Sequence, residues 1–141
     1  MLPSLTPHKS IWVLILAAAS ACSPEGEVTR TDTLHGKALY DARCAQCHGV
    51  DGSGAGPASL GLGAPPPSLR RLSNGNGGVF PREYVMATID GLSRHNQLTA
   101  AMPEFGAGDL GPIVQVEEDG LSTPIPAELI ALANYLETIQ D

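Results

Sequence analysis

Five consecutive residues, Cys44-Ala45-Gln46-Cys47-His48, form the pattern with the most specific chemistry in this sequence. Two thiols three positions apart, followed directly by an imidazole, match the spacing for covalent attachment of a c-type haem. One turn of helix sets the thiols at the separation of the haem vinyl groups, and the next residue then directs a ring nitrogen at the iron. Such a site stores one electron and leaves the protein little bond-making chemistry. The motif therefore predicts one covalent haem c in an electron carrier rather than in an enzyme.

Two other chemistries use cysteines at this spacing. A thioredoxin-like redox pair needs a preceding strand within a βαβ unit. A zinc site needs four ligands, and the adjacent Cys47 and His48 would strain a shared tetrahedron. Its remaining ligands would be Cys44 with His35 or His95. The sequence favours haem over both.

The N-terminal residues have the proportions of an export signal. Lys9 precedes an apolar run from Ile11 to Ala19, which is too short for a membrane span of about 20 residues. Small residues then provide a cleavage site. The stretch Ala19-Ser20-Ala21-Cys22 resembles a bacterial lipoprotein signal, in which the cysteine becomes the lipidated first residue. We expect a signal peptide over 1–21 and a lipid on Cys22; ordinary cleavage nearby or an uncleaved anchor are the alternatives.

The cysteine count agrees with these two motifs. The chain has three cysteines. If Cys22 carries lipid while Cys44 and Cys47 carry haem, no thiol is left over and no disulfide is needed. The sequence thus accounts for an odd number of cysteines in an exported protein.

Composition and charge restrict the partners and the core. The formal net charge is −7, with 15 acidic and eight basic residues, which argues against nucleic acid and favours partners with basic docking faces. Aromatic residues make up only 4% of the chain, which also contains 16 Gly and 12 Pro. A buried porphyrin would supply the missing apolar mass, so we expect the haem-free protein to be largely unfolded.

The elements that must position the motif are helices joined by long loops. A polar tether is expected over residues 22–32, and a domain over 33–141. The first helix should begin near Thr31–Thr33, where side chains can cap the first turn, and should end near Gly49. Gly36 in that helix costs about 1 kcal/mol relative to Ala, which predicts a close contact with another helix.

Further along, the chain alternates between loops and helices. Residues 49–80, rich in Gly and Pro, are expected to form an irregular loop around one side of the haem, rather than a disordered linker. A second helix should open at Pro81-Arg82-Glu83 and stop before Gly91. The last helix should begin at Pro126, with an apolar face at helical spacing. We expect no paired strands, although Ile113–Val116 could form a short extended piece.

Three segments together resemble the class I (monohaem) cytochromes c. The haem motif with Asp51-Gly52-Ser53-Gly54-Ala55-Gly56-Pro57 looks like the glycine-rich stretch of many bacterial members. Ala101-Met102-Pro103-Glu104-Phe105-Gly106 is similar to the distal-ligand segment, and Leu132-Ala133-Asn134-Tyr135-Leu136 resembles the C-terminal helix. The resemblance covers nearly all of residues 33–140. It implies an all-α, cytochrome c-like fold of three or more helices, with long loops wrapped around one haem.

The resemblance also implies roles for single residues. Cys44 and Cys47 would form the thioethers. His48 would be the proximal ligand, and the Pro57 carbonyl would fix its tautomer. Met102 would supply the distal sulfur, and His/Met ligation raises the reduction potential of the haem relative to ligation by two histidines. With both axial positions filled, oxygen and peroxide have nowhere to bind.

Several of these assignments have rivals. Met102 could be an ordinary core methionine, and His95 is the main competitor for the iron. Met86 is expected in the core. In the family the first and last helices cross at a small residue, and Gly36 with Tyr40 would fit that contact by facing Leu132 and Tyr135.

Residues 106–126 form an insertion relative to the shorter family pattern. The acidic run Glu117-Glu118-Asp119 lies within it. Such a run is usually a solvated loop; the alternative is a partner-docking element.

The sequence as a whole predicts an exported, lipid-anchored electron carrier on the periplasmic side of a bacterial membrane. Its partners would be a redox donor and acceptor that dock briefly and less tightly as salt rises. We expect no nucleic acid and no small-molecule substrate. The alternatives are a haem enzyme or gas-sensing domain with a labile sixth ligand, and a fixed haem subunit of a respiratory complex.

Overall fold

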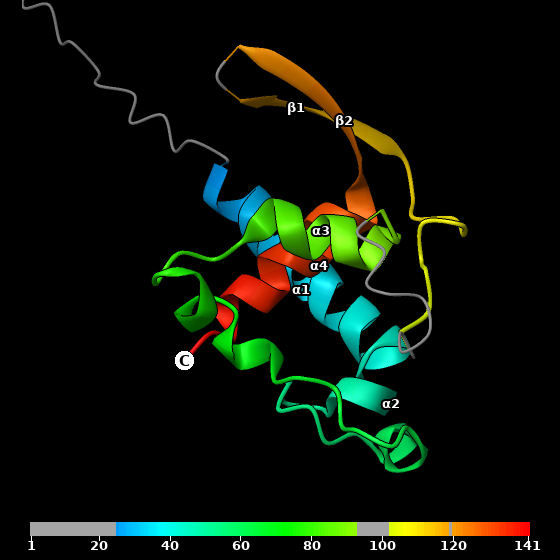
Figure 1. The fold of residues 1–141 in the computed structure, drawn as a ribbon. Helices are drawn as coiled ribbons and strands as arrows, with labels where there is room; N and C mark the ends of the chain where they lie inside the picture. The colour runs from blue at the N-terminus through cyan, green and yellow to red at the C-terminus, as the bar shows by residue number, and fades with distance from the viewer. Residues whose placement is uncertain (1–24, 93–101, 119) are drawn as a thin grey trace, which may run out of the picture.

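The computed structural model describes residues 25–92, 102–118 and 120–141 (Figure 1). Most of its regular structure is helical, as expected. The elements in chain order are α1 (Glu25–Arg43), α2 (Ala45–His48), three short 3-10 helices η1 (Pro57–Gly61), η2 (Leu69–Arg71) and η3 (Asn74–Asn76), α3 (Arg82–Asp90), β1 (Ile113–Glu118), β2 (Leu121–Pro126) and α4 (Ala127–Thr138). None of the helices in these ranges is both long enough and apolar enough to span a bilayer.

The first helix begins earlier than the sequence analysis predicts. Glu25, the first residue that the structure describes, is already helical, so the helix begins before Thr31 and residues 25–32 of the expected tether are helical. The capping residues favour a start at Thr31 locally, but they do not prevent the helix from extending in the N-terminal direction. The predicted signal peptide and Cys22 lie outside the described residues.

Helices α1 and α4 cross in close contact at Gly36, as predicted. A Cβ atom at Gly36 would lie 1.9 Å from the backbone oxygen of Ala131 and 3.0 Å from Cβ of Tyr135. The rings of Tyr40 and Tyr135 pack together beside this crossing, with centroids 5.2 Å apart. The absence of a side chain at position 36 therefore sets the distance between the two helices.

Helix α4 is the centre of the hydrophobic core. Six of its 12 residues are buried: Leu129, Ala131, Leu132, Ala133, Tyr135 and Leu136. Helix α3 packs across it (Figure 1) and contributes the buried Val85 and Ile89. Both helices have nearly the bounds that the sequence predicts, and the expected apolar face of α4 is the buried one.

The segment from Gly49 to Phe80 forms an irregular loop with three single 3-10 turns, as expected. Residues at the end of the chain fasten it. The Gln140 side chain donates to the Leu69 carbonyl at 2.8 Å and accepts from the Ser73 amide at 2.9 Å. The Asp141 amide donates to the Arg70 carbonyl at 2.9 Å. These bonds hold the loop against the end of α4.

The prediction that the chain has no paired strands is wrong. Strands β1 and β2 form an antiparallel hairpin, with a register that runs from Ile113↔Pro126 to Glu118↔Leu121. The dipeptide Asp119-Gly120 is a strong hairpin signal, and Gly120 has a φ of 77°. Prolines in the second strand conceal this signal, since Pro normally counts against a strand.

Candidate functional site

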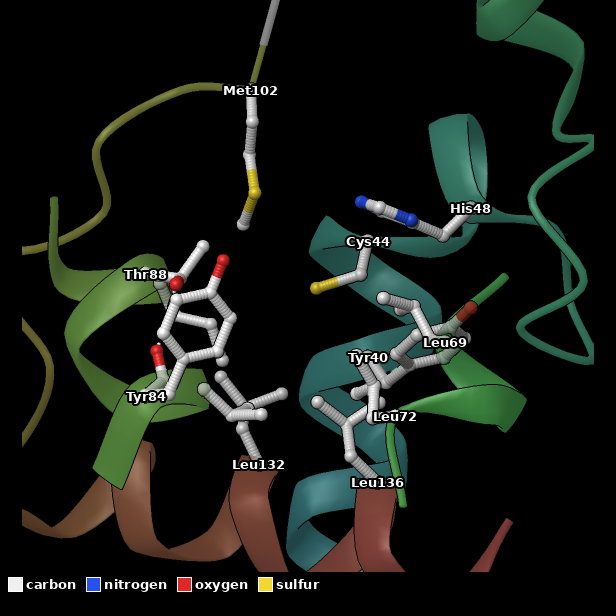
Figure 2. Close-up of a pocket in the computed structure, with 12 residues that line it drawn as sticks. Tyr40, Cys44, His48, Leu69, Leu72, Tyr84, Thr88, Met102, Leu132 and Leu136 are labelled. Atoms are coloured by element: carbon white, nitrogen blue, oxygen red, sulfur yellow. Dashed lines mark hydrogen bonds between the residues drawn. The ribbon is translucent and has the colours of Figure 1, made fainter. Parts of the chain in front are cut away.

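An apolar cavity, partly open to solvent, lies between α1, α3, α4 and the loop around η2. Leucines from the loop and from α4 form much of its wall, as Figure 2 shows. Its lining is almost entirely apolar, with a few polar side chains that converge on it, which is the usual character of cofactor sites. The cavity is therefore the candidate site.

His48 projects into this cavity from the end of α2 (Figure 2). Its side chain is buried, and burial lowers its pKa, so the imidazole is neutral and able to bind a metal. Within the described residues, Nδ1 is buried without a hydrogen bond of normal geometry. The backbone of Pro67 lies near the ring and partly offsets this lowering of the pKa. Because Nδ1 has no hydrogen bond of normal geometry to any described residue, the contact between Pro67 and the ring is long or poorly aligned.

The backbone group beside His48 thus belongs to Pro67 and not to the predicted Pro57, which begins η1. The glycine-rich stretch explains the difference. The Gly54 amide donates to the His48 carbonyl at 2.8 Å, and Gly54 has a φ of 98°. A Cβ atom there would lie 2.3 Å from the carbonyl oxygen of Pro66. Gly54 therefore allows the returning loop to bring Pro66 and Pro67 against the haem motif.

The two motif cysteines are both half-buried free thiols. Cys44 lines the cavity, and its sulfur points into the open space (Figure 2). Burial raises the pKa of Cys44 to about 11, whereas the cysteines of redox pairs have lowered pKa values. Cys47 is not among the lining residues. The environment of Cys44 gives the thioredoxin-like alternative no support.

The structure gives the zinc alternative no support either. Within residues 25–92, 102–118 and 120–141, no three His, Cys, Asp or Glu side chains are grouped so that they could hold a metal ion. His35 is exposed on α1, and His95 lies outside the described residues. The groups that could hold a cofactor are those that face the cavity.

Met102 reaches the cavity from a segment distant in sequence from the motif. Figure 2 shows its sulfur extending into the space that the His48 ring and the Cys44 sulfur also face. Two backbone hydrogen bonds fix the segment to the end of α3: the Phe105 amide donates to the Ile89 carbonyl at 3.1 Å, and the Gly106 amide donates to Asp90 at 3.0 Å. Met86 packs against the core, as predicted, and so does Met102, but Met86 is not among the residues that line the cavity.

Three further side chains belong to the site, although the sequence analysis assigned them no role there. Tyr84 and Thr88, one helical turn apart on α3, line the cavity opposite His48 (Figure 2). Tyr40 is 1% exposed, and its hydroxyl donates to the Gly49 carbonyl at 2.6 Å. Burial raises the pKa of Tyr40 well above its usual range, which keeps it a neutral donor. The i, i+4 spacing of Tyr84 and Thr88 places them on one face of the predicted helix, and this was the signal in the sequence that could have identified them.

The residues around the cavity fit a haem. An imidazole and a thioether face the same apolar space, and this pair of donors suits iron in a porphyrin. The thiol of Cys44 faces that space too. The leucine walls would exclude water from a flat apolar group.

Comparison with known proteins agrees with this geometry. Residues 34–140, about three-quarters of the chain, match the family described as Cytochrome c. A stretch of 23 residues is 70% identical to the thiosulfate dehydrogenase of Allochromatium vinosum, which amounts to 16% of this chain and 8% of that protein. The chain thus spans less than a tenth of that relative. No solved structure gives a significant match.

Proposed function

This chain belongs to the cytochrome c family, and from that premise we propose that it is a single-electron carrier with one haem c. Membership implies a covalently bound haem and haem-based electron transfer. The proposal adds that Cys44 and Cys47 form the thioethers and that His48 and Met102 are the axial ligands. The observation that carries it is the meeting of an imidazole, a thiol and a thioether in one apolar cavity.

The protein's own residues have three tasks in this function. His48 and Met102 approach the cavity from separate segments (Figure 2), so each can take one axial position. The bound haem supplies the one-electron redox chemistry. The apolar wall would keep water from a haem bound there, and the buried Tyr40 hydroxyl holds the carbonyl of Gly49, the residue after His48. A fixed ligand set keeps the structural change on electron transfer small.

We expect no enzymatic activity, because two axial ligands leave no open position for a substrate. The position of the Met102 sulfur in the cavity supports this expectation. The similarity to thiosulfate dehydrogenase covers too little of either protein to suggest a reaction. A haem enzyme or gas sensor would need Met102 to be displaced.

Optical spectra test the ligand assignment. The ferric protein should show the weak far-red band of a sulfur–iron bond. Met102→Ala should abolish it, whereas His95→Ala should keep it. Met86→Ala is a matched control, since Met86 packs against the core outside the cavity. A band that survives in Met102→Ala, or ready binding of carbon monoxide by the ferrous wild type, would reject His/Met ligation.

The partners are expected to be redox proteins with basic docking faces. From residue 95 to residue 141 the chain has eight acidic residues and no Lys or Arg. Three arginines elsewhere are already engaged in ion pairs with acidic residues of this region: Arg43 with Glu128, Arg82 with Glu137, and Arg70 with Asp141. The excess of acidic over basic residues in 95–141 favours basic partners, and electron exchange with them should slow as salt rises.

The proposed location is the periplasmic side of a bacterial membrane, where a lipid on Cys22 would anchor the chain after removal of residues 1–21. The support for this location is the sequence pattern alone. Labelling of cells with palmitate should mark the wild type and not Cys22→Ala. Persistent label in the variant would reject lipidation at this residue, and it would leave the proposed electron transfer intact.

A further inference from the structure

The hairpin formed by β1 and β2 stands away from the helices (Figure 1). Its base touches α4 through β2, but large apolar side chains along it are exposed: Ile113 by 60%, Val114 by 42% and Leu121 by 69%. Within the described residues, the sheet has only these two strands. An isolated two-stranded sheet is marginally stable in water, and stability requires three or more strands with a hydrophobic face or packing against a helix. Within the part of the chain that the structure describes, the hairpin therefore has no further strand beside it.

The two outer edges of the hairpin differ in their hydrogen-bonding capacity. The Ala127 amide donates to the Pro112 carbonyl at 2.9 Å, and this pair continues the β1–β2 register. Hydrogen-bonded and non-hydrogen-bonded pairs alternate in an antiparallel ladder. Counted from this pair, every second residue therefore forms its backbone hydrogen bonds within the hairpin. The residues between them direct their backbone groups outward: Ile113, Gln115 and Glu117 on β1, and Ser122, Pro124 and Pro126 on β2.

Proline closes one of these edges and leaves the other open. Pro124 and Pro126 have no N–H to offer, which is a common protection of edge strands. On β1, all three outward residues keep both the N–H and the C=O. Gln115 and Glu117 are exposed, so nothing within the described chain covers this part of the edge. An added strand can therefore pair with β1 and not with β2.

We propose that the open edge of β1 pairs, antiparallel, with β1 of a second copy of this chain, so that two hairpins form one four-stranded sheet. The two-fold axis would pass through Gln115, and Ile113 of each copy would lie opposite Glu117 of the other. Each of the resulting hydrogen-bonded pairs would exchange two N–H···O bonds. Such an interface uses the same surface on both copies and closes as a dimer.

The side chains favour this register over the one shifted toward the tip of the hairpin. Val114 would lie opposite Val116 of the second copy, and these valines share a face with Thr123 and Leu121. The apolar face would then continue across four strands, and a sheet of three or more strands with a hydrophobic face is more stable than a two-stranded one. Glu117 would face an isoleucine, whereas a shift of the two-fold axis by two residues would place two Glu117 side chains directly opposite each other, a destabilising arrangement.

Because the chain is acidic, the salt dependence of association distinguishes this dimer from the docking of a basic partner. Each copy has a formal net charge of −7, so two copies repel each other and salt screens the repulsion. Self-association through β1 should therefore strengthen as salt rises. Binding of a basic protein to the same acidic hairpin would weaken.

Sedimentation velocity of the mature, haem-loaded chain in a mild detergent tests the proposal, with Gln115→Pro and Ser122→Pro as matched variants. Both substitutions replace an outward-facing residue, and both remove the 3.0 Å hydrogen bond from the Ser122 hydroxyl to Gln115. The hairpin should tolerate both, because Pro124 already occupies the position opposite Gln115. Only Gln115→Pro removes an N–H from the open edge.

The wild type should form dimers in a concentration-dependent way, more strongly at higher salt. Gln115→Pro should raise the dissociation constant more than about tenfold, since both bonds of the central pair are lost, and Ser122→Pro should leave it within about twofold. A wild type that stays monomeric at every concentration would overturn the proposal. So would equal weakening by the two variants, or a dimer that salt weakens.

Amide hydrogen exchange supplies a second readout that does not depend on the variants. The outward amides of Ile113, Gln115 and Glu117 should become protected as the protein concentration rises. The Ser122 amide, on the closed edge, should continue to exchange rapidly. Protection that does not change with concentration on β1, or that grows equally at Ser122, would exclude pairing through this edge.

Discussion

The contact at Gly36 makes a prediction in which two opposing effects can be compared. In an exposed helix, replacement of Gly by Ala stabilises a protein by about 1 kcal/mol. Here the new Cβ would lie 1.9 Å from the Ala131 oxygen, whereas ordinary contact begins at 3.4 Å. Helices α1 and α4 would have to separate by about 1.5 Å, the difference between these distances. Gly36→Ala should therefore destabilise the fold.

The magnitude follows from which atoms collide. Overpacking of a core costs about 1–3 kcal/mol, and occasionally more. The obstructing atoms at Ala131 are backbone atoms, which no change of rotamer can move, so the cost should be at or above the upper end. After subtraction of the helix-propensity gain, the net loss is about 2 kcal/mol or more. For a domain of about 110 residues, a loss of about 2 kcal/mol lowers the Tm by roughly 9 °C.

Chemical and thermal unfolding of the haem-loaded protein would measure this loss. Gly75→Ala in η3 is the control, because no atom lies within 4 Å of a Cβ built there; its effect should stay within about 0.5 kcal/mol. The reduction potential of Gly36→Ala should match that of the wild type, because Gly36 is not among the residues that line the cavity. If Gly36→Ala proves as stable as the wild type or more so, the helix crossing described above is wrong.

Three further predictions concern the loop, the motif and the cofactor. Tyr40→Phe should lower the free energy of unfolding by about 0.5–1.5 kcal/mol, because the bond from its hydroxyl to the Gly49 carbonyl is lost while the Gly52 amide still donates to that carbonyl at 3.2 Å; an unchanged denaturation midpoint would contradict this. Gly54→Ala should lower the Tm more than Gly77→Ala, since both have positive φ but only Gly54 has a close neighbour, the Pro66 oxygen; equal losses would remove that contact from the explanation. Haem-free protein, made without haem attachment, should have weak far-UV circular dichroism, because the cavity would leave the core unfilled; native-like helicity would refute this.

Local signals in the sequence were sufficient for some elements and insufficient for others. Pro81 and Gly91 bracket α3, and Pro126 precedes α4, so both helices could be placed almost to the residue. The hairpin was missed because Pro124 and Pro126 argue against a strand. They are compatible with β2 only because their nitrogens face outward, and the pairing register determines which way a residue faces.

The sequence by itself determined the chemistry and the family of this protein. The spacing of Cys44, Cys47 and His48 predicts haem attachment because covalent geometry along one helical turn is local. Only the tertiary structure placed Met102 at the same cavity, and only the path of the loop put Pro67, rather than Pro57, beside His48. These outcomes depend on contacts between segments that are distant in sequence. Packing and backbone hydrogen bonds determine such contacts, so the local pattern around Met102 indicates its role only through the resemblance to the family.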